Sequence, residues 1–219
     1  MSILVQANGK NIVIDAGPDF RQQMLRTGID HLDGVILTHE HNDHVIGFDD
    51  VRPFNFRQKQ GIPVYAVERV QVELKKRFEY VFAEKKYPGA PTLDLYTISK
   101  NGKFEVAGVS VIPIEVIHGR LPVLGFRFGD FTYITDAKTI EEEEMEKIKG
   151  TKVLIINALH FREHYSHFNV PQVLEVIKQL NPEKAYITHV SHNMGLAAEV
   201  NKVLPENVQL AYDTQEIII

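Results

Sequence analysis

One short stretch, THEHNDH at residues 38–44, constrains this chain more than any other feature of its sequence. It follows the apolar run GVIL, and its imidazoles and carboxylates are ligands that zinc, manganese and iron accept in proteins. Alternate residues of an extended segment point to the same side, so His39 and His41 can share one ion. If the chain then turns into a helix, Asp43 and His44 project from its first turn toward a second ion. The stretch predicts a buried strand leading into a loop that serves two neighbouring metal ions, whereas the plainer interpretation is a solvated polar loop.

Further metal ligands are available at the ends of other apolar runs. His118 ends the run IPIEVIH, Asp136 ends TYITD, and His189 follows AYIT. Each is a polar residue between a β-rich run and a loop, and several strand ends behaving alike argue against isolated surface residues. We therefore expect these side chains to meet at one edge of the sheets. Asp136 is suited to bridge two ions, because a carboxylate can offer one oxygen to each.

The composition limits the kinds of site that the chain can build. It has ten histidines and no cysteine among 219 residues, which excludes disulfides, thiolate zinc sites, iron–sulfur clusters and cysteine nucleophiles. The net charge of −5 disfavours general nucleic-acid binding. No apolar run reaches 18 residues, and the first residues lack the features of a secretory signal, so we expect no membrane partner and a cytoplasmic protein. A homodimer is compatible with the sequence.

Strand-like and helix-like segments alternate along the chain without a linker, a repeat or a break in composition. A single domain over residues 1–219 is therefore predicted. Hairpins are expected at residues 2–17 and 125–136, so the sheets should be mixed rather than purely parallel. The helices are expected at residues 19–28, 68–86, 139–150, 169–182 and 195–205. The other strands are expected at residues 34–39, 63–67, 104–119, 152–159, 184–191 and 208–219.

The order of these segments and motifs resembles the metallo-β-lactamase superfamily over nearly the whole chain. The residues that carry the resemblance are Asp15 in VIDAG, the His39–His44 motif, His118, Asp136 and His189. The resemblance implies a four-layer αββα sandwich of the α/β (α+β) class, with mixed sheets and the metals at one edge of the paired sheets. The ligands it implies are His39, His41 and His118 for one ion, Asp43, His44 and His189 for the other, and Asp136 between them. Asp15 would support the metal loop without binding metal, although a turn aspartate before Gly17 explains it almost as well.

Two further histidines resemble residues of the phosphodiesterase branch of that superfamily. His167 lies in a loop ahead of the helix of residues 169–182 and matches the histidine that this branch adds to the metal ligands. His192 follows His189 and matches the phosphate-facing histidine of phosphoribosyl 1,2-cyclic phosphate phosphodiesterases. Both could instead be ordinary loop residues. The related RNase Z enzymes share the first histidine but usually add a flexible basic arm, and the basic segment ELKKRF is interpreted here as a solvated helix face.

The activity implied by the resemblance is hydrolysis of a small, for example cyclic, phosphodiester by a water activated between two divalent metal ions. Asp43 and Asp136 would orient the metals and the nucleophile. His167 would protonate the leaving alkoxide or stabilise charge on the phosphorus centre, and His192 would donate a hydrogen bond to phosphate. The resemblance favours zinc or manganese, and the ligand set also suits iron.

Other functions stay open on this sequence. A thiolester or lactone hydrolase, an RNA-processing nuclease, and a non-catalytic metal-binding member are the alternatives. Members of the subfamily usually begin with another strand and a Gly/Ser/Thr-rich loop. We therefore expect the first strand of the fold to be missing from this sequence.

Overall fold

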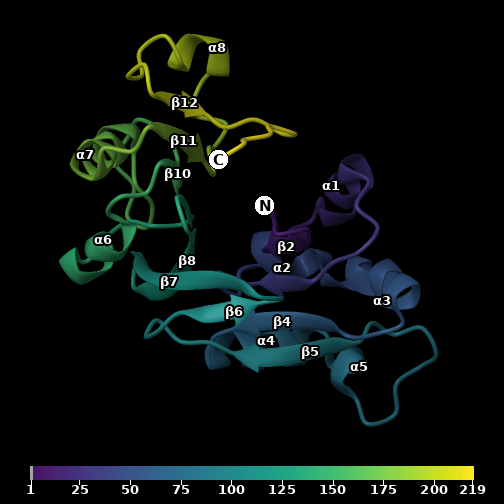
Figure 1. Ribbon diagram of the computed structural model, residues 1–219. Coiled ribbons are helices and arrows are strands. Elements are labelled where there is room, and N and C mark those ends of the chain that lie inside the picture. The colour runs from purple at the N-terminus through teal and green to yellow at the C-terminus, as the bar shows by residue number, and fades with distance from the viewer. Residues whose placement is uncertain (1) are drawn as a thin grey trace. The chain divides into compact units, whose positions relative to one another are not determined.

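The computed structural model describes residues 2–219, and their contacts fall into two compact units. The first unit runs to Ser99 and includes Phe104–Val109, while the second comprises Lys100–Lys103 and Ser110–Ile219. A five-stranded sheet lies in the first unit, and most of a seven-stranded sheet lies in the second (Figure 1). Both sheets contain parallel and antiparallel pairs, so the predicted α/β class with mixed sheets is confirmed. The prediction of a single domain over residues 1–219 stays a prediction.

The sheet of the first unit has the order β1-β2-β3-β4-β5. β1 and β2 form the predicted hairpin, and the strands from β2 to β5 run parallel. The hairpin turns at Asn8-Gly9, where both residues have positive φ, as the tight turn of an Asn-Gly pair requires. The strands are β1 (Ile3–Ala7), β2 (Lys10–Ile14), β3 (Gly34–Ile36), β4 (Ile62–Ala66) and β5 (Leu93–Thr97). The helices are α1 (Phe20–Thr27), α2 (Asn42–Val45), the 3-10 helix η1 (Ile46–Val51), α3 (Arg52–Gln58), α4 (Glu68–Arg77) and α5 (Glu79–Phe82).

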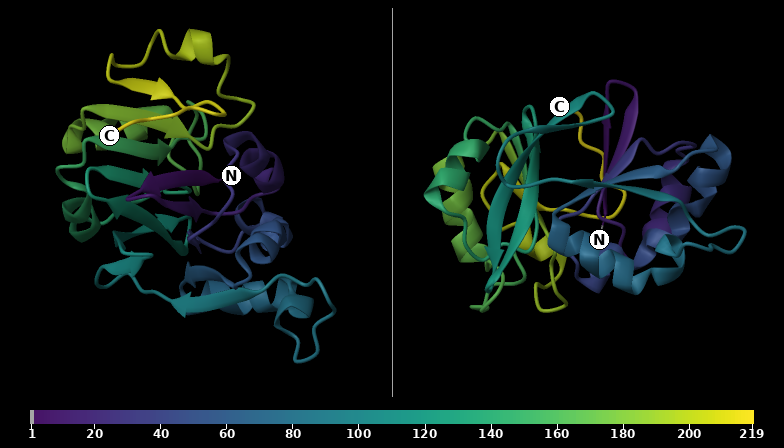
Figure 2. Two further views of the ribbon diagram at one scale, coloured as in Figure 1. Left: turned by 45° about the vertical axis from the view of Figure 1, so that its right-hand side comes forward. Right: turned by 90° about the horizontal axis from the view of Figure 1, so that it is seen from below.

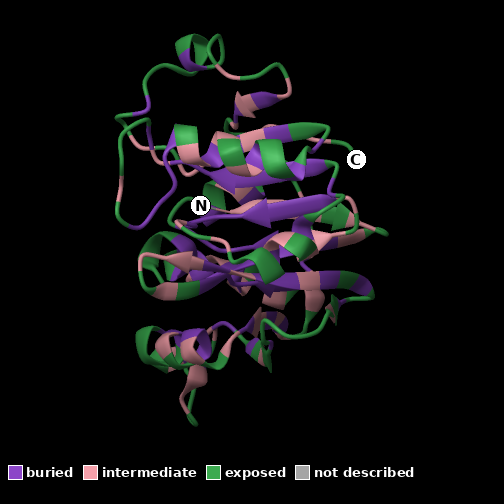
Figure 3. Ribbon diagram, turned by 90° about the vertical axis from the view of Figure 1, so that its left-hand side faces the viewer, coloured by how far each residue is buried: buried purple, intermediate pink, exposed green. Residues whose placement is uncertain are grey.

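Helices and strands of the first unit share one hydrophobic core. Phe20 of α1, Val35 of β3, Val64 of β4 and Leu74 of α4 are fully buried in it. Every residue of β3 is buried, which explains why this strand reads as a continuous apolar run rather than an alternating one. In Figure 3 the strands are mostly buried, whereas the helices carry bands of exposed residues. Because parallel strands end at the same edge, the loops after β2 and β3 lie together, and that edge is where the metal ligands begin.

Gly47 lets the chain beyond the THEHNDH stretch pass close to the end of β2. A Cβ atom at this position would lie 2.2 Å from the carbonyl oxygen of Gly17, a distance that no side chain tolerates. The Gly47 amide donates to the carbonyl of Ala16 at 2.9 Å, and the Ala16 amide donates to the carbonyl of His44 at 2.7 Å. Ala16, two residues after β2, is therefore bonded both to the last residue of the metal-ligand motif and to Gly47.

The sheet of the second unit has the order β12-β11-β10-β9-β8-β7-β6. β7, β8 and β9 form an antiparallel meander, and the strands from β9 to β12 run parallel. β7 and β9 are both antiparallel to β8, so β7, β9, β10 and β11 all end at the same edge. The strands are β6 (Phe104–Val106), β7 (Val109–His118), β8 (Leu121–Phe128), β9 (Phe131–Ile134), β10 (Val153–Asn157), β11 (Lys184–Thr188) and β12 (Val208–Leu210). The helices are α6 (Glu142–Ile148), α7 (Val170–Leu180) and α8 (Ala197–Val200).

Helix α7 packs on the second sheet, on the same side as α6 (Figure 2). It begins with a capping box, in which the Asn169 side chain accepts from the Gln172 amide at 2.9 Å and the Gln172 side chain accepts from the Asn169 amide at 3.2 Å. Val173 and Ile177 then lie in the core of the unit. The cap fixes the point where the preceding loop, which carries His167, joins the helix.

Several predicted bounds are wrong for physical reasons. The helix predicted over 68–86 is interrupted at Phe78, whose ring is buried and whose backbone leaves the helical region, so α4 and α5 are separate. The helix predicted over 195–205 has a single turn, and the last strand ends at Leu210 although the apolar pattern continues. Helices η1 and α3 and strand β5 were not predicted. None of the helices among residues 2–219 is long and apolar enough to span a membrane.

Candidate metal centre

The metal loop, residues 38–44, has the two-part shape that its spacing predicts. β3 ends just before it, His41 is still extended at φ −64° and ψ 149°, and α2 begins at the next residue. The His39 Nε2 and His41 Nδ1 atoms lie 3.0 Å apart. Two nitrogens bound to one tetrahedral zinc at 2.0–2.1 Å lie about 3.3 Å apart, so the pair is already spaced for a shared ion. Asp43 and His44 project from the first turn of α2, with Asp43 Oδ2 3.2 Å from His44 Nε2.

Asp15 organises this loop from the end of β2. Its Oδ1 accepts from the Thr38 amide at 2.9 Å, and its Oδ2 accepts from the Thr38 hydroxyl at 2.8 Å and lies 2.7 Å from His44 Nδ1. Thr38 Oγ1 has one proton, which it gives to Asp15, so it accepts from His39 Nδ1 at 3.0 Å. All four side chains are fully buried. These bonds hold the Nδ1 atoms of His39 and His44, so a metal ion would bind these rings through Nε2, and they favour Asp15 as a support over a simple turn residue.

The second unit gathers its own set of ligands around one carboxylate oxygen. Asp136 Oδ1 lies 4.0 Å from His118 Nε2, 3.7 Å from His167 Nδ1 and 3.3 Å from His189 Nε2. The ligand atoms of His118, Asp136 and His167 all lie within 4.8 Å of one another. The residues come from the end of β7, the loops after β9 and β11, and the loop before α7. The structure thus brings the predicted strand ends of this unit to one place.

Backbone strain marks three of these strand ends. Asp15, Asp136 and His189 each follow a strand by one or two residues, and each has a positive φ, of 61°, 56° and 54°. Left-handed conformations are unfavourable for residues with a side chain, and they persist where the surroundings over-determine them, often at functional sites. The positive φ ends the extended backbone at each of these residues, and the sequence pattern does not predict it.

Supporting residues hold the second set in place, and sequence reasoning missed them. His118 Nδ1 lies 2.8 Å from the carbonyl of Ser166, so a metal ion would bind this ring through Nε2, and the Thr135 hydroxyl donates to Asp136 Oδ2 at 2.6 Å. Asn157 accepts from the Ala137 amide at 2.7 Å and donates to its carbonyl at 3.0 Å. Asn157 is fully buried at the end of the apolar strand β10, and a polar residue in that position was the signal available in the sequence.

His167 differs from the other histidines of the second unit. Its side chain is buried, and no residue from 2 to 219 hydrogen-bonds to its Nδ1 atom, which points at Asp136 Oδ1 from 3.7 Å. Burial lowers the pKa of His167 to about 4, although the neighbouring Asp136 carboxylate acts in the opposite direction. The ring is therefore neutral near pH 7. A buried imidazole nitrogen without a hydrogen bond, beside a carboxylate and two other imidazoles, fits a place where a cation or an anionic ligand completes the arrangement.

His192 and His164 are not among the residues of the two ligand sets. His192 is exposed in the turn after β11 and is not part of the group formed by His118, Asp136 and His167. His164 lies between His167 and Tyr165, with ring centroids at 5.2 Å and 4.8 Å. Burial lowers the pKa of His164 as well. The phosphate-binding role that sequence reasoning assigned to His192 stays a prediction.

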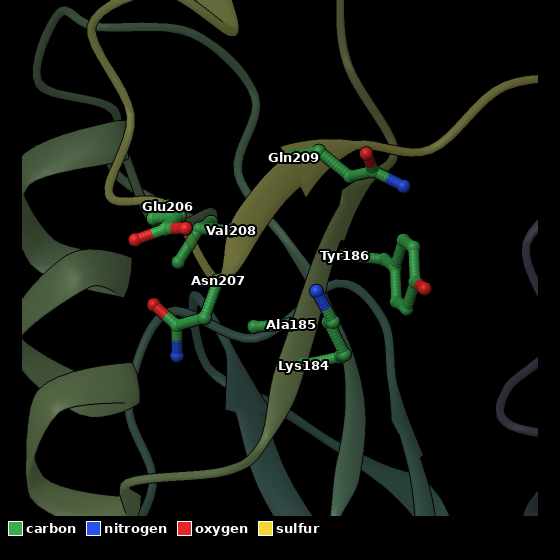
Figure 4. Close-up of a pocket in the computed structure, with 7 residues that line it drawn as sticks. All are labelled: Lys184, Ala185, Tyr186, Glu206, Asn207, Val208 and Gln209. Atoms are coloured by element: carbon green, nitrogen blue, oxygen red, sulfur yellow. The ribbon is translucent and has the colours of Figure 1, made fainter. Parts of the chain in front are cut away.

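A small polar pocket lies elsewhere in the second unit, between β11 and β12 (Figure 4). It is lined by Lys184–Tyr186 and Glu206–Gln209. None of the predicted site residues lines it, and it offers neither a histidine nor a pair of carboxylates. The metal-ligand sets, rather than this pocket, are the candidate functional site.

Comparison with known proteins decides the family. A family model described as the beta-lactamase superfamily domain matches residues 10–190. The chain belongs to the beta-lactamase superfamily. Within it the chain falls in the branch that contains the PhnP-family diphosphatase and ribonuclease Z, as the resemblance predicted. The family consists largely of metal-dependent hydrolases, so the histidine and aspartate sets are candidate ligands for divalent metal ions.

Three similar proteins show how far the likeness extends. A crystal structure of a new diphosphatase from the PhnP family is 35% identical with a TM-score of 0.89, covering 97% of this chain and 80% of that one. An octanoyltransferase of Porphyromonas gingivalis is 41% identical over 218 residues, which are 99% of this chain and 44% of that protein. A ribonuclease Z of Bradyrhizobium diazoefficiens is 48% identical over 48 residues, which are 21% of this chain and 16% of that protein. The chain thus spans less than half the length of the curated relatives it matches.

Proposed function

We propose that this protein is a metal-dependent phosphodiesterase that hydrolyses a small, for example cyclic, phosphodiester. The observation that carries the proposal is His167, a buried neutral histidine beside the Asp136 set with an Nδ1 atom that has no hydrogen bond among the described residues. A phosphate group, with several anionic oxygens, needs donors besides the metals.

The donor set supports two divalent ions. Following the assignment that the family resemblance implies, we propose His39, His41 and His118 for one ion, Asp43, His44 and His189 for the other, and Asp136 between them. Two such ions would polarise the phosphate and lower the pKa of a bound water. The supporting bonds of Asp15, Thr38 and Ser166 favour this use of the histidines, because they occupy the Nδ1 atoms of His39, His44 and His118. Zinc or manganese suits these ligands best, and iron is compatible with them.

The chain's own side chains then have distinct tasks. Asp43 and Asp136 would orient the nucleophile and hold its proton. His167 is neutral near pH 7, so we assign it a hydrogen bond to a phosphate oxygen, which stabilises the charge that develops there, in preference to a stored proton for the leaving group. His192 is exposed, and a hydrogen bond to the more distant part of the substrate is the role that suits it.

The names of the similar proteins indicate which other substrate classes should be considered. The PhnP-family diphosphatase favours a phosphorus centre as the target, and a phosphoric anhydride is the second candidate substrate class. An RNA-processing role is supported by a short match to ribonuclease Z. Octanoyl transfer is named for a protein more than half of which lies outside the match, so it gives little support for an acyl substrate here. A cytoplasmic location, a homodimer, and the absence of membrane and general nucleic-acid partners belong to this proposal.

A substrate panel combined with elemental analysis tests the proposal. Freshly purified protein should contain close to two divalent transition-metal ions per chain and should cleave bis(p-nitrophenyl) phosphate and a cyclic phosphodiester. The same protein should leave a thiolester, a lactone and a tRNA precursor intact. Metal-loaded protein that cleaves only the thiolester or lactone would refute phosphodiester chemistry, and metal-loaded protein that cleaves nothing would favour a non-catalytic member.

A further inference from the structure

Helix α4 contacts the metal loop through two arginines, both of which bind the residue between two proposed ligands. Arg69 donates to the Glu40 carboxylate through Nη1 and forms an ion pair with it. Arg77 donates to the main-chain carbonyl of Glu40 through Nη1. Glu40 lies between His39 and His41, so its side chain and its carbonyl are both held at the point where the loop must keep two imidazoles in register.

Side chains alternate in direction along an extended segment, which explains why the arginines contact Glu40 and not the histidines. His39 and His41 point to one side, and Glu40 points to the other. Arg69 and Arg77 are about two turns apart on α4, which places both on the side of the helix that faces the loop. The sequence had indicated a solvated face for the segment ELKKRF, but the structure gives Arg77, which belongs to it, a specific partner.

Helix α4 is held in place by buried residues and hydrogen bonds, so the positions of its two arginines are fixed by the fold of the first unit. Val70 and Leu74 are fully buried in the core of the first unit. The Gln71 side chain donates to the carbonyl of Ala66 at 3.0 Å and to the Thr97 hydroxyl at 3.1 Å, which ties α4 to strands β4 and β5. The Glu40 side chain is only 15% exposed, and Arg69 is 36% exposed, so their ion pair is partly shielded from water.

We infer that Glu40, Arg69 and Arg77 form a clamp that positions His39 and His41 for metal binding. The clamp keeps the backbone between the two histidines fixed, and it also keeps the Glu40 carboxylate turned away from the ions. A carboxylate flanked by two ligands would otherwise be a competing ligand itself. The three residues are positioning residues and touch neither metal nor substrate. The inference rests on the proposed metal site, and its test uses zinc alone.

Zinc affinity of the purified chain, measured by competition with a fluorescent chelator, tests the clamp. Glu40→Ala, Arg69→Ala and Arg77→Ala should each bind zinc about 10-fold more weakly, within the range found when groups that orient ligands are removed. Arg69→Lys, which keeps the charge but loses the fork of donors, should fall between Arg69→Ala and the wild type. The double variant Glu40→Ala/Arg69→Ala should be no weaker than the single ones, because both changes break the same contact.

Matched controls separate positioning from a general effect of charge or stability. Lys75→Ala and Lys76→Ala remove charges from the same helix, where Lys76 pairs with Glu73 and neither contacts Glu40, and they should keep wild-type zinc affinity. Circular dichroism and thermal unfolding of the metal-free variants should match the wild type. Clamp variants that bind zinc as tightly as the wild type would overturn the inference. Wild-type protein that binds no zinc in the same titration would instead overturn the proposed function.

Discussion

The two ligand sets of this protein are built in contrasting ways. In the first unit the ligands lie within one loop of seven residues, and Asp15 and Thr38 fix their rings through buried hydrogen bonds. In the second unit His118, His167 and His189 come from separate places in the chain and converge on Asp136 Oδ1, and two of them, His118 and His189, are proposed ligands. The ligands of the first set are close together in the sequence, whereas those of the second are brought together by the packing of strands in the sheet.

The two ligand sets should therefore differ in the substitutions that disturb them. The first set depends on a few buried side-chain bonds to one carboxylate. The second depends on three strands, β7, β9 and β11, ending at one edge of the sheet, and one of its supporting bonds runs to the backbone carbonyl of Ser166. Substitutions of side chains should therefore disturb the first set more than the second, unless they remove a ligand.

Loss of a ligand should have the largest effect and should be similar in both sets. His41→Ala and Asp136→Ala should each lose metal and should lower kcat/KM by at least about 1,000-fold, because the metals supply most of the electrostatic stabilisation. Elemental analysis and phosphodiesterase assays measure both quantities. The assignment of these residues fails if the variant with both changes retains stoichiometric metal.

Removal of Asp15 should be the most damaging change that touches no proposed ligand. Asp15→Ala leaves the Thr38 and His44 donors buried without their acceptor, at a free-energy cost of about 3 kcal/mol. Zinc affinity should fall by about 10–100-fold. Thermal unfolding and chelator competition test this, with Asp19→Ala, an exposed aspartate nearby, as the control. Wild-type zinc affinity in Asp15→Ala would show that the buried network does not orient the ligands.

His167→Gln should separate catalysis from metal binding. The variant should keep its metal but lower kcat on a cyclic phosphodiester by about 100-fold, the usual size of one positioned catalytic group. The control is His31→Ala, because His31 pairs with Asp30 and Asp33 away from the ligand sets. An unchanged kcat would remove His167 from the mechanism, and a loss of metal would make it a ligand instead.

A pair of threonine variants compares the supports of the two sets directly. Thr38→Val removes a hydroxyl that bonds Asp15 and His39 of the first set, whereas Thr135→Val removes one that bonds Asp136 of the second. Both should destabilise the fold by about 1 kcal/mol, but Thr38→Val should weaken zinc binding more, by about 10-fold. Equal effects, or a larger one from Thr135→Val, would contradict the contrast drawn between the two sets.

His192→Ala should have the smallest effect. An exposed histidine in a turn can contribute one solvent-competed hydrogen bond to substrate, so KM should rise by about three-fold with kcat unchanged. Steady-state kinetics on a cyclic phosphodiester measures the split. A large fall in kcat would place His192 closer to the reacting phosphorus than its exposure indicates.

The sequence by itself determined the parts of this protein that depend on short spacing. The alternation of His39 and His41, the helical turn at Asp43 and His44, the hairpin at Asn8-Gly9 and the mixed sheets all follow from local rules of backbone geometry. The end of each apolar run also marked His118, Asp136 and His189, because a polar residue there interrupts the hydrophobic pattern of the strand.

Only the tertiary structure decided which supports surround those residues. Asp15 is 23 positions from Thr38, Glu40 is 29 from Arg69, and Asn157 is 20 from Ala137. Such pairs have no fixed spacing, since they meet only after separate strands and helices have packed. The positive φ of Asp136 and His189, and the lowered pKa of His167, are likewise consequences of packing. A local pattern specifies the chemistry that a loop can offer, and the packed fold specifies the orientation and protonation that make it usable.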